Sequence, residues 1–222
     1  MSYIDDYILS LEQAKKVPGI VPMDYEQAMK TVIKIGKALN KKEPVFNIDK
    51  DNEHIFKNLV KYFHNDPSFD GSLNKGIFLH GVCGVGKSLV MSAFIHYVNM
   101  MSTITCPNPF RKCMEYTAKE IAIEYSEEGI KILRNYCKPE ILIQDLGYEG
   151  DENMEVIHFG QRVQPLAELI SYRNDLMDRG LYRTHFTSNL THENIQEIYS
   201  VREWSRAKEM FNFIEMKGND RR

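Results

Sequence analysis

The stretch Gly81-Val82-Cys83-Gly84-Val85-Gly86-Lys87-Ser88 carries residue types whose spacing suits the binding of a phosphate chain. It follows the pattern of a glycine, four further residues and then Gly-Lys-Ser or Gly-Lys-Thr. Glycines let backbone N–H groups crowd around phosphate oxygens, and a helix that starts here adds partial positive charge. Lys87 can reach the β- and γ-phosphates, and Ser88 can hold Mg²⁺. We therefore predict a nucleoside triphosphate site from Gly81 to Leu89.

A second candidate is the carboxylate that follows the apolar run Glu140-Ile141-Leu142-Ile143. The run continues as Gln144-Asp145-Leu146-Gly147. An apolar strand that ends in an acid, downstream of a phosphate loop, is the expected place for a residue that orients Mg²⁺ or the attacking water. Asp145 is therefore predicted to be catalytic and to share the metal with Ser88.

The elements that must position these residues alternate between strand and helix. Gly76–His80 is short and apolar and predicts a buried strand, and the residues after the loop predict a buried helix. Further strands are expected at 112–116, 140–147, 184–188 and 213–216, and helices at 52–64, 118–136 (divided at Gly129) and 193–212. This alternation predicts an α/β fold, a three-layer α/β/α sandwich around a parallel sheet.

Composition favours a globular protein of ordinary kind. The chain has 222 residues, 43% of them hydrophobic, and a formal net charge of −3. This net charge does not indicate nucleic-acid binding. No apolar run is long enough to cross a bilayer, so no membrane partner is expected. The four cysteines form no CxxC pair and are expected to be reduced thiols of a cytoplasmic protein.

Residues 1–43 are expected to form a helical N-terminal extension, and residues 44–222 the core. One helix is predicted to begin after Met23 with Asp24 as its N-cap. No chemical motif lies in this extension. It is interpreted either as a docking arm for a partner or as a brace on the core.

The motifs occur in an order that resembles a known family. After the phosphate loop and Asp145-Leu146-Gly147 come a strand ending in Thr187-Ser188-Asn189, a helix containing Ser205-Arg206 and a Gly-x-Asp-x-Arg tail. Together these resemble the AAA+ ATPases of the DnaC/IstB type, which include replicative helicase loaders and transposition ATPases. The lead-in Asp70–Gly76 resembles the variety found in Bacteroidetes and their phages.

The resemblance implies roles for further residues and for partners. Asn189 matches the sensor 1 residue that positions the lytic water or reads the γ-phosphate, and Arg206 the arginine finger that acts on a neighbouring subunit's nucleotide. Arg222 matches the sensor 2 arginine that contacts phosphate, with its neighbour Arg221 as the alternative. ATP and Mg²⁺ are the implied cofactors. A hexameric replicative helicase, single-stranded DNA and further copies of the chain are the implied partners.

One position departs from the family pattern. The family usually has two adjacent acids before Leu-Gly or Ile-Gly, and here those positions hold Gln144 and Asp145. Either Asp145 does the work of both acids, or the protein acts mainly as a nucleotide-binding switch. In both cases we expect weak ATPase activity.

Phe110, Arg111, Lys112 and Arg162 are candidate contacts to single-stranded DNA, because cationic and aromatic groups bind its backbone and bases. An ordinary solvated charge cluster is the alternative. Three functions remain open: a helicase loader, an IstB-like transposition ATPase that acts with a transposase on duplex DNA, and a small-molecule kinase. The kinase is disfavoured because no arginine-rich lid is recognisable between Asp145 and Asn189.

Overall fold

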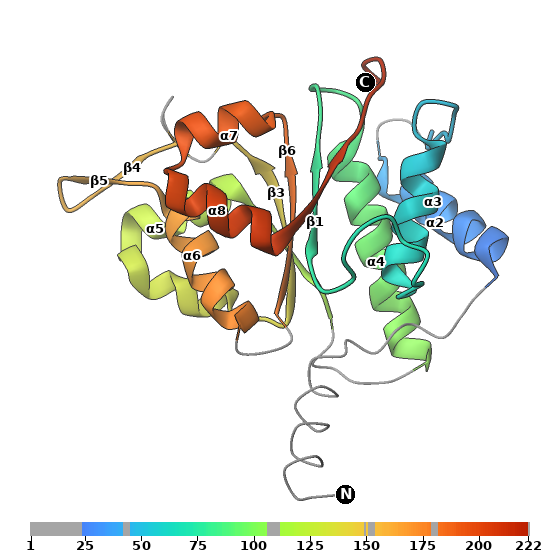
Figure 1. The fold of residues 1–222 in the computed structure, drawn as a ribbon, viewed down its shortest axis with the longest axis horizontal. Coiled ribbons are helices and arrows are strands. Elements are labelled where there is room, and N and C mark those ends of the chain that lie inside the picture. The colour runs from blue at the N-terminus through green and yellow to red at the C-terminus, as the bar shows by residue number, and fades with distance from the viewer. Residues whose placement is uncertain are drawn as a thin grey trace, which may run out of the picture.

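The computed structural model of the chain describes residues 24–41, 45–105, 112–148, 150, 154–178 and 182–221. The elements in chain order are α2 (Tyr25–Leu39), α3 (Glu53–Phe63), β1 (Gly76–His80), α4 (Lys87–Thr105), β2 (Met114–Thr117), α5 (Ala118–Glu128), the short 3-10 helix η2 (Gly129–Tyr136), β3 (Glu140–Leu146), β4 (Val156–His158), β5 (Gln161–Val163), α6 (Pro165–Asp178), β6 (Arg183–Ser188), α7 (His192–Ile198), α8 (Val201–Met210) and β7 (Phe211–Glu215). Figure 1 shows their arrangement.

Within the described residues, five strands form one sheet in the order β2-β3-β6-β1-β7. Each pairing in it is parallel. The carboxyl ends of β1, β3 and β6 therefore meet along one edge, where loops following a parallel sheet form ligand sites. The strands β4 and β5 pair separately as an antiparallel hairpin.

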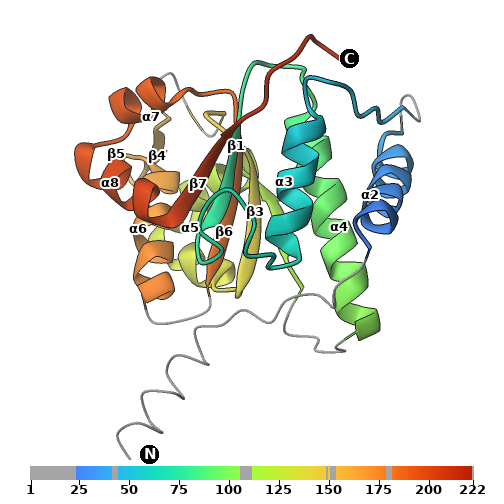
Figure 2. The ribbon, with the colours of Figure 1, turned by 45° about the vertical axis from the view of Figure 1, so that its right-hand side comes forward.

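Helices cover both faces of the sheet (Figures 1 and 2). The helices α2, α3 and α4 lie on one face, where Ile77 and Leu79 of β1 join their core. The helices α5, α6 and α8 lie on the other face with Phe78. Successive side chains of β1 thus enter opposite cores, which explains its unbroken apolar sequence. The predicted three-layer α/β sandwich is confirmed.

The helix α2 packs against α4 and buries Ala28, Met29, Val32 and Gly36. Gly36 is required there because a Cβ atom would lie about 2.4 Å from the ring of Phe46. This part of the predicted extension therefore braces the core. Residues 1–23 lie outside the described residues, so a docking role for them stays a prediction.

Three details differ from the elements expected from sequence. The helix predicted over 193–212 is two helices, because Tyr199 ends α7 and Ser200 caps α8 by accepting a hydrogen bond from the backbone N–H of Arg202. The last strand begins earlier, at Phe211. The hairpin β4–β5 and the helix α6 were not predicted.

Other elements follow the prediction closely. Asp24 is the N-cap of α2, and Gly129, at a φ of 69°, separates α5 from η2. Cys83, Cys113 and Cys137 are free thiols in the described part of the chain, and Cys106 lies outside it. Over the described ranges, the helices all fall short of the length or the apolar character that crossing a membrane requires.

The amino end of the sheet holds a buried ionic group. One oxygen of Glu140 accepts hydrogen bonds from Arg183 at 3.0 Å and from His185 at 2.9 Å. Burial would raise the pKa of Glu140, but the charge of Arg183 and the bond from His185 outweigh it and lower this pKa to about 2. Burial lowers the pKa of His185, whose Nδ1 accepts a bond from the backbone N–H of Ile77. His185 is therefore neutral, with its proton on Nε2.

Arg173 of α6 is fully buried beside this group. Its guanidinium donates to Thr184 Oγ1 and to the backbone oxygens of Tyr136, Lys138 and Arg183, over 2.6 to 3.0 Å. Burial lowers the pKa of Arg173 to about 10, so the side chain is still charged at neutral pH. Arg173 and Arg183 thus join elements of the fold and do not form a lid over a ligand.

Candidate functional site

The phosphate loop lies between β1 and α4, where the sequence predicted it. Gly84 and Gly86 have φ angles of 87° and 96°, a left-handed region that side chains with a Cβ rarely adopt. Val85 is fully buried and anchors the loop in the core. The helix α4 begins directly at Lys87, so the partial positive charge of its N-terminus faces the loop.

Lys87 is held at the centre of this loop. Its side chain is 5% exposed, and Nζ donates to the backbone oxygens of Gly81 at 2.8 Å and Val82 at 2.9 Å. The same nitrogen donates to Asn189 Oδ1 at 2.6 Å, so residues from the ends of β1 and β6 meet here. The predicted sensor residue therefore contacts the predicted phosphate-binding lysine.

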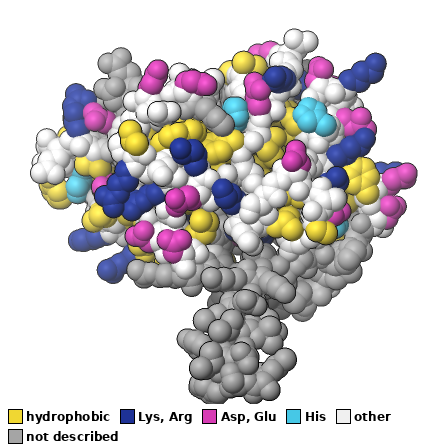
Figure 3. Space-filling model, in the orientation of Figure 1, with side chains coloured by type: hydrophobic (Ala, Val, Ile, Leu, Met, Phe, Trp, Pro, Cys, Tyr) yellow, Lys and Arg dark blue, Asp and Glu magenta, His cyan; other side chains and the backbone are white. Residues whose placement is uncertain are grey.

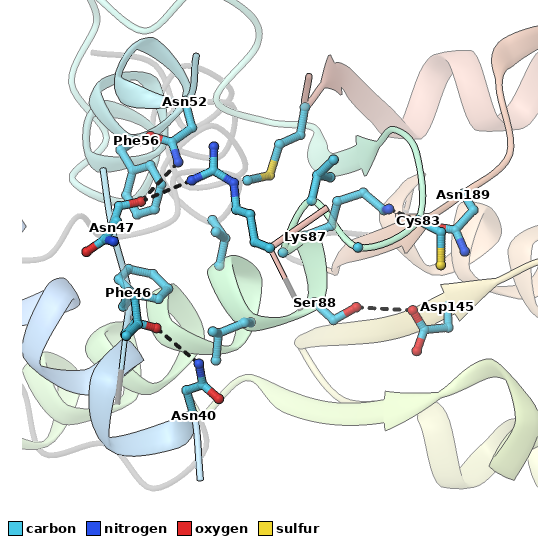
Figure 4. A pocket seen from close by; sticks show the side chains of 18 of the residues that line it. Asn40, Phe46, Asn47, Asn52, Phe56, Cys83, Lys87, Ser88, Asp145 and Asn189 are labelled. Carbon is cyan, nitrogen blue, oxygen red and sulfur yellow. Dashed lines mark hydrogen bonds between the residues drawn. The ribbon is translucent and has the colours of Figure 1, made fainter. Parts of the chain in front are cut away.

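Asp145 lies at the end of β3 and faces Ser88 of α4 (Figure 4). The Ser88 hydroxyl donates to Asp145 Oδ1 at 3.1 Å. The backbone of Asp145 has a φ of 59°, and its N–H donates to Thr187 Oγ1 at 3.1 Å. A hydroxyl and a carboxylate oxygen next to a phosphate loop are donors that fit Mg²⁺, which prefers oxygen ligands and keeps several waters.

These residues open into a cavity of about 1000 Å³. Lys87, Ser88, Asp145 and Asn189 lie on one side of it, and side chains from the segment before α3 lie on the other (Figure 4). The described residues that line it are Asn40, Val45, Phe46, Asn47, Asn52, Phe56, Cys83, Gly84, Val85, Gly86, Lys87, Ser88, Leu89, Val90, Thr117, Lys119, Asp145, Tyr148, Asn189, Met216 and Arg221.

The wall formed by residues 45–56 was not recognised in the sequence. Phe46 and Phe56 pack edge to face, with ring centroids 5.5 Å apart. Asn52 is buried, and its side chain both donates and accepts hydrogen bonds. Its Nδ2 donates to the backbone oxygen of Asn47 at 3.1 Å, and its Oδ1 accepts from the backbone N–H of Asp49 at 2.8 Å. An apolar wall with fixed polar groups suits the flat, partly apolar base of a nucleotide.

Arg221 closes the rim of the cavity, whereas Arg222 lies outside the described residues. The guanidinium of Arg221 pairs with Asp49 at 2.6 Å, and its backbone N–H donates to the oxygen of Gly84 at 3.0 Å. The hydrogen bond from Arg221 lowers the pKa of Asp49. The structure thus places Arg221 at the rim of the site, and the role expected of Arg222 stays a prediction.

Solved structures share this arrangement of elements. A candidate primosome component from Streptococcus pyogenes serotype M3 aligns with a TM-score of 0.55 and 20% identity, over 78% of this chain and 84% of its own. DnaI aligns with a TM-score of 0.52 and 18% identity, over 78% of this chain and 88% of DnaI. AMPPCP-bound DnaA from Aquifex aeolicus aligns at 0.52 and 16% identity, over 79% of this chain and 50% of DnaA. The chain has the three-layer α/β fold that these structures share.

At these identities the likeness concerns the fold alone. No protein-family model and no curated protein sequence matches this chain. The roles of individual residues in this chain therefore have to be argued from the geometry of the site itself.

Arg206 lies on α8, away from the residues that line the cavity. Its guanidinium donates to the hydroxyl of Ser171 and lies 4.0 Å from Asp175, both on α6. The side chain is 20% exposed. An arginine that acts on a neighbouring subunit's nucleotide has to lie outside its own cavity, as this one does.

Of the four predicted DNA contacts, the structure describes Lys112 and Arg162, which lie on different segments. Lys112 is exposed just before β2, and Phe110 and Arg111 lie outside the described residues. Arg162 is exposed on β5 and pairs with Glu155 at 3.2 Å. Next to it, at the tip of the hairpin, Phe159 is 93% exposed. Its exposure could not be seen in the sequence, because it depends on the hairpin.

Proposed function

We propose that this chain is a slow, Mg²⁺-dependent ATPase of the helicase-loader type. The convergence of Lys87, Asp145 and Asn189 on one cavity beside the phosphate loop carries this proposal. Asp145 lies at the end of β3, Asn189 directly follows β6, and Lys87 begins the helix α4 after the loop that follows β1. A buried lysine, a carboxylate and an amide that point into one cavity are what phosphoryl transfer to water requires.

Each of these residues has a distinct task in the proposal. Lys87 binds the β- and γ-phosphates, and Asn189 orients the attacking water. Ser88 and Asp145 hold Mg²⁺, which neutralises charge on the phosphates when bound. Asp145 is the one acidic side chain among the described residues that line the cavity, so a second carboxylate for polarising water is missing there. We therefore expect turnover below the enzyme median of about 10 s⁻¹.

Assembly would complete the site. We assign Arg221, at the rim of the cavity, to the phosphates of its own subunit. We assign Arg206 to the nucleotide of a neighbouring subunit in a homo-oligomer formed with ATP or DNA. A trans arginine neutralises charge in the transition state and contributes about 10³-fold or more to the rate.

A further solved structure with this fold is the DnaC helicase loader, which aligns with a TM-score of 0.50 and 16% identity over 78% of this chain and 94% of its own and supports a role with a helicase. For single-stranded DNA, the hairpin β4–β5 offers Arg162 for the backbone and Phe159 for stacking with a base. The hairpin projects from the side of the molecule opposite α2 (Figure 1). Basic side chains on the face in Figure 3 lie among acidic and apolar ones, so we expect few phosphate contacts.

The test is the anisotropy of a labelled single-stranded oligonucleotide titrated with protein, with an ATP analogue, with ADP and without nucleotide. Wild type, Lys87→Ala and the pair Phe159→Ser and Arg162→Gln are compared at two salt concentrations, with Lys30→Gln as the exposed control. We expect binding that requires the ATP analogue, weakens with salt and fails in Lys87→Ala. Phe159→Ser and Arg162→Gln should each weaken binding several-fold.

Absence of binding in every nucleotide state would contradict the single-stranded DNA role. Binding of duplex DNA in its place would favour the transposition ATPase. A pull-down of a hexameric helicase with the ATP-bound protein, absent in Lys87→Ala, would complete the case for the loader.

A further inference from the structure

Three polar side chains meet beside the cavity without lining it. Ser92 of α4, Glu115 of β2 and Gln144 of β3 form a closed triangle of hydrogen bonds. The Ser92 hydroxyl donates to Glu115 Oε1 at 2.6 Å. Gln144 Nε2 donates to Ser92 Oγ at 2.8 Å and also to Glu115 Oε1. The amide nitrogen of Gln144 is thus bonded to both neighbours, and its side chain is held against α4.

The backbone next to this triangle is irregular. The pairing of β3 with β6 is regular up to Ile143↔Phe186 and resumes at Leu146↔Ser188. Gln144 and Asp145 therefore face Thr187 alone, and β3 contains one extra residue. Such a bulge turns a side chain out of the regular alternation of a strand.

The bulge changes the direction of Asp145. Leu142 packs in the core on the α4 face, so the period of two places Gln144 on that face and would place Asp145 on the other. Instead, with a φ of 59°, Asp145 also contacts α4, at Ser88. Ser88 and Ser92 are one helical turn apart. Two consecutive residues of β3 thus contact consecutive turns of the same helix.

We propose that Glu115 is a positioning residue for the metal site. By holding the Gln144 amide against Ser92, Glu115 fixes the bulge in the form that directs the Asp145 carboxylate to Ser88. This inference rests on the proposed function, because its consequence is the binding of Mg²⁺ between Ser88 and Asp145.

The triangle also explains why glutamine occupies position 144. Glu115 offers only acceptor oxygens at neutral pH, so its partner has to donate. An acid at 144 would place two carboxylates in contact, which disfavours the charged form of both. With Glu115 on the neighbouring strand, an amide is the side chain that completes the triangle.

The test is the dissociation constant of a fluorescent ATP analogue, measured with Mg²⁺ and with EDTA. The ratio of the two constants isolates the contribution of Mg²⁺. Glu115→Ala should reduce this ratio about five- to tenfold, in line with the loss of one ordinary hydrogen bond, and leave the EDTA constant within about twofold. Glu115→Gln keeps an acceptor oxygen for Gln144 and Ser92, so its ratio should stay within about twofold of wild type.

Glu127→Ala removes an exposed acid of α5 and is the matched control, and the melting temperature of each variant checks the fold. The reversed pair Glu115→Gln with Gln144→Glu should keep a ratio near wild type, whereas Gln144→Glu alone should lower it. In the reversed pair the amide at 115 donates to the acid at 144.

Three results would overturn the proposal. An equal loss with Mg²⁺ and with EDTA would make Glu115 a general structural residue. An equal loss in Glu115→Gln and Glu115→Ala would mean that its charge acts, and not its position. An unchanged ratio of the two dissociation constants in Glu115→Ala would show that Glu115 has no role in positioning the metal site. If wild type itself binds no nucleotide, the proposed function is wrong. That result differs from the three above, which concern Glu115 alone.

Discussion

The two ends of the parallel sheet both gather polar side chains, but they use them differently. At the amino end, Glu140 accepts hydrogen bonds from Arg183 and His185, all three side chains are at most 13% exposed, and the charges of Glu140 and Arg183 neutralise each other. At the carboxyl end, Lys87 donates to two loop oxygens and to Asn189, Asp145 accepts from Ser88, and both residues line a cavity of about 1000 Å³.

This difference separates charges that stabilise the fold from charges that serve a ligand. A buried ionic group whose members satisfy each other's hydrogen bonds has none left for a ligand. Removing one member leaves the charge of another buried without a partner, which destabilises the fold. A lysine and a carboxylate that face a cavity can exchange their protein partners for phosphate and metal. Mutations at the amino end should therefore mainly lower stability, and mutations at the carboxyl end should mainly weaken nucleotide binding.

The largest expected effect is on stability, in Glu140→Gln. This change leaves the buried charge of Arg183 without its counterion and should lower the free energy of unfolding by about 3–5 kcal/mol. Urea denaturation measures it, with Glu26→Gln, an exposed acid of α2, as the control. A loss no larger than that of the control would contradict the role assigned to the amino end.

Acid should have a related effect on the wild type. The pKa of His185 is below its usual 6.5, so the unfolded chain takes up a proton first as the pH falls through 6.5, and stability begins to fall. The pKa of Glu140 is lowered from 4.5 to about 2, so its contribution is fully present above 4.5 and is lost between 4.5 and 2. Denaturation at a series of pH values should show both phases, and Glu140→Gln should lack the lower one.

A smaller effect is expected at the carboxyl end of β2. The Thr117 hydroxyl accepts a bond from the Glu120 N–H at 3.1 Å, and Glu120 accepts one from the Thr117 N–H at 2.9 Å. This capping box begins α5, and Thr117→Ala should lower the free energy of unfolding by about 1 kcal/mol. Thr117→Ser keeps the hydroxyl and is the control. A loss as large as that of Glu140→Gln would remove the contrast between the two ends.

The smallest effect on stability should come from Asp145→Asn. Asparagine tolerates the left-handed backbone of this position, so the free energy of unfolding should change by less than about 0.5 kcal/mol. The same variant should lose about tenfold of the Mg²⁺-dependent part of nucleotide affinity, because the metal loses a charged ligand. Unchanged Mg²⁺ dependence in this variant would show that the metal binds elsewhere.

Much of the site could be predicted from the sequence because the decisive residues are local to their strands. The phosphate loop and Asn189 directly follow predicted strands, Asp145 lies near the end of another, and the carboxyl ends of parallel strands meet. The direction of Gln144 could not be predicted, since it depends on a bulge and on Glu115 of a neighbouring strand.

Two further features depend on long-range packing. The cavity wall around Asn52 is formed by a segment whose distance from the phosphate loop is set by how α2 and α3 pack on α4. Arg221 and Arg222 are adjacent in sequence and equivalent in type, so only the path of the tail over Gly84 distinguishes Arg221. Local residue patterns contain neither kind of information.

The central claim is tested most directly by titrating wild type and Lys87→Ala with a fluorescent ATP analogue and Mg²⁺, beside urea denaturation of both. Removing the lysine should weaken binding more than tenfold, since charge-assisted bonds to phosphate are lost, and should change the free energy of unfolding by less than about 2 kcal/mol. At temperatures where it is folded, Glu140→Gln should bind the nucleotide as wild type does, but its free energy of unfolding should be clearly lower. Nucleotide binding by Lys87→Ala equal to that of wild type would contradict the account.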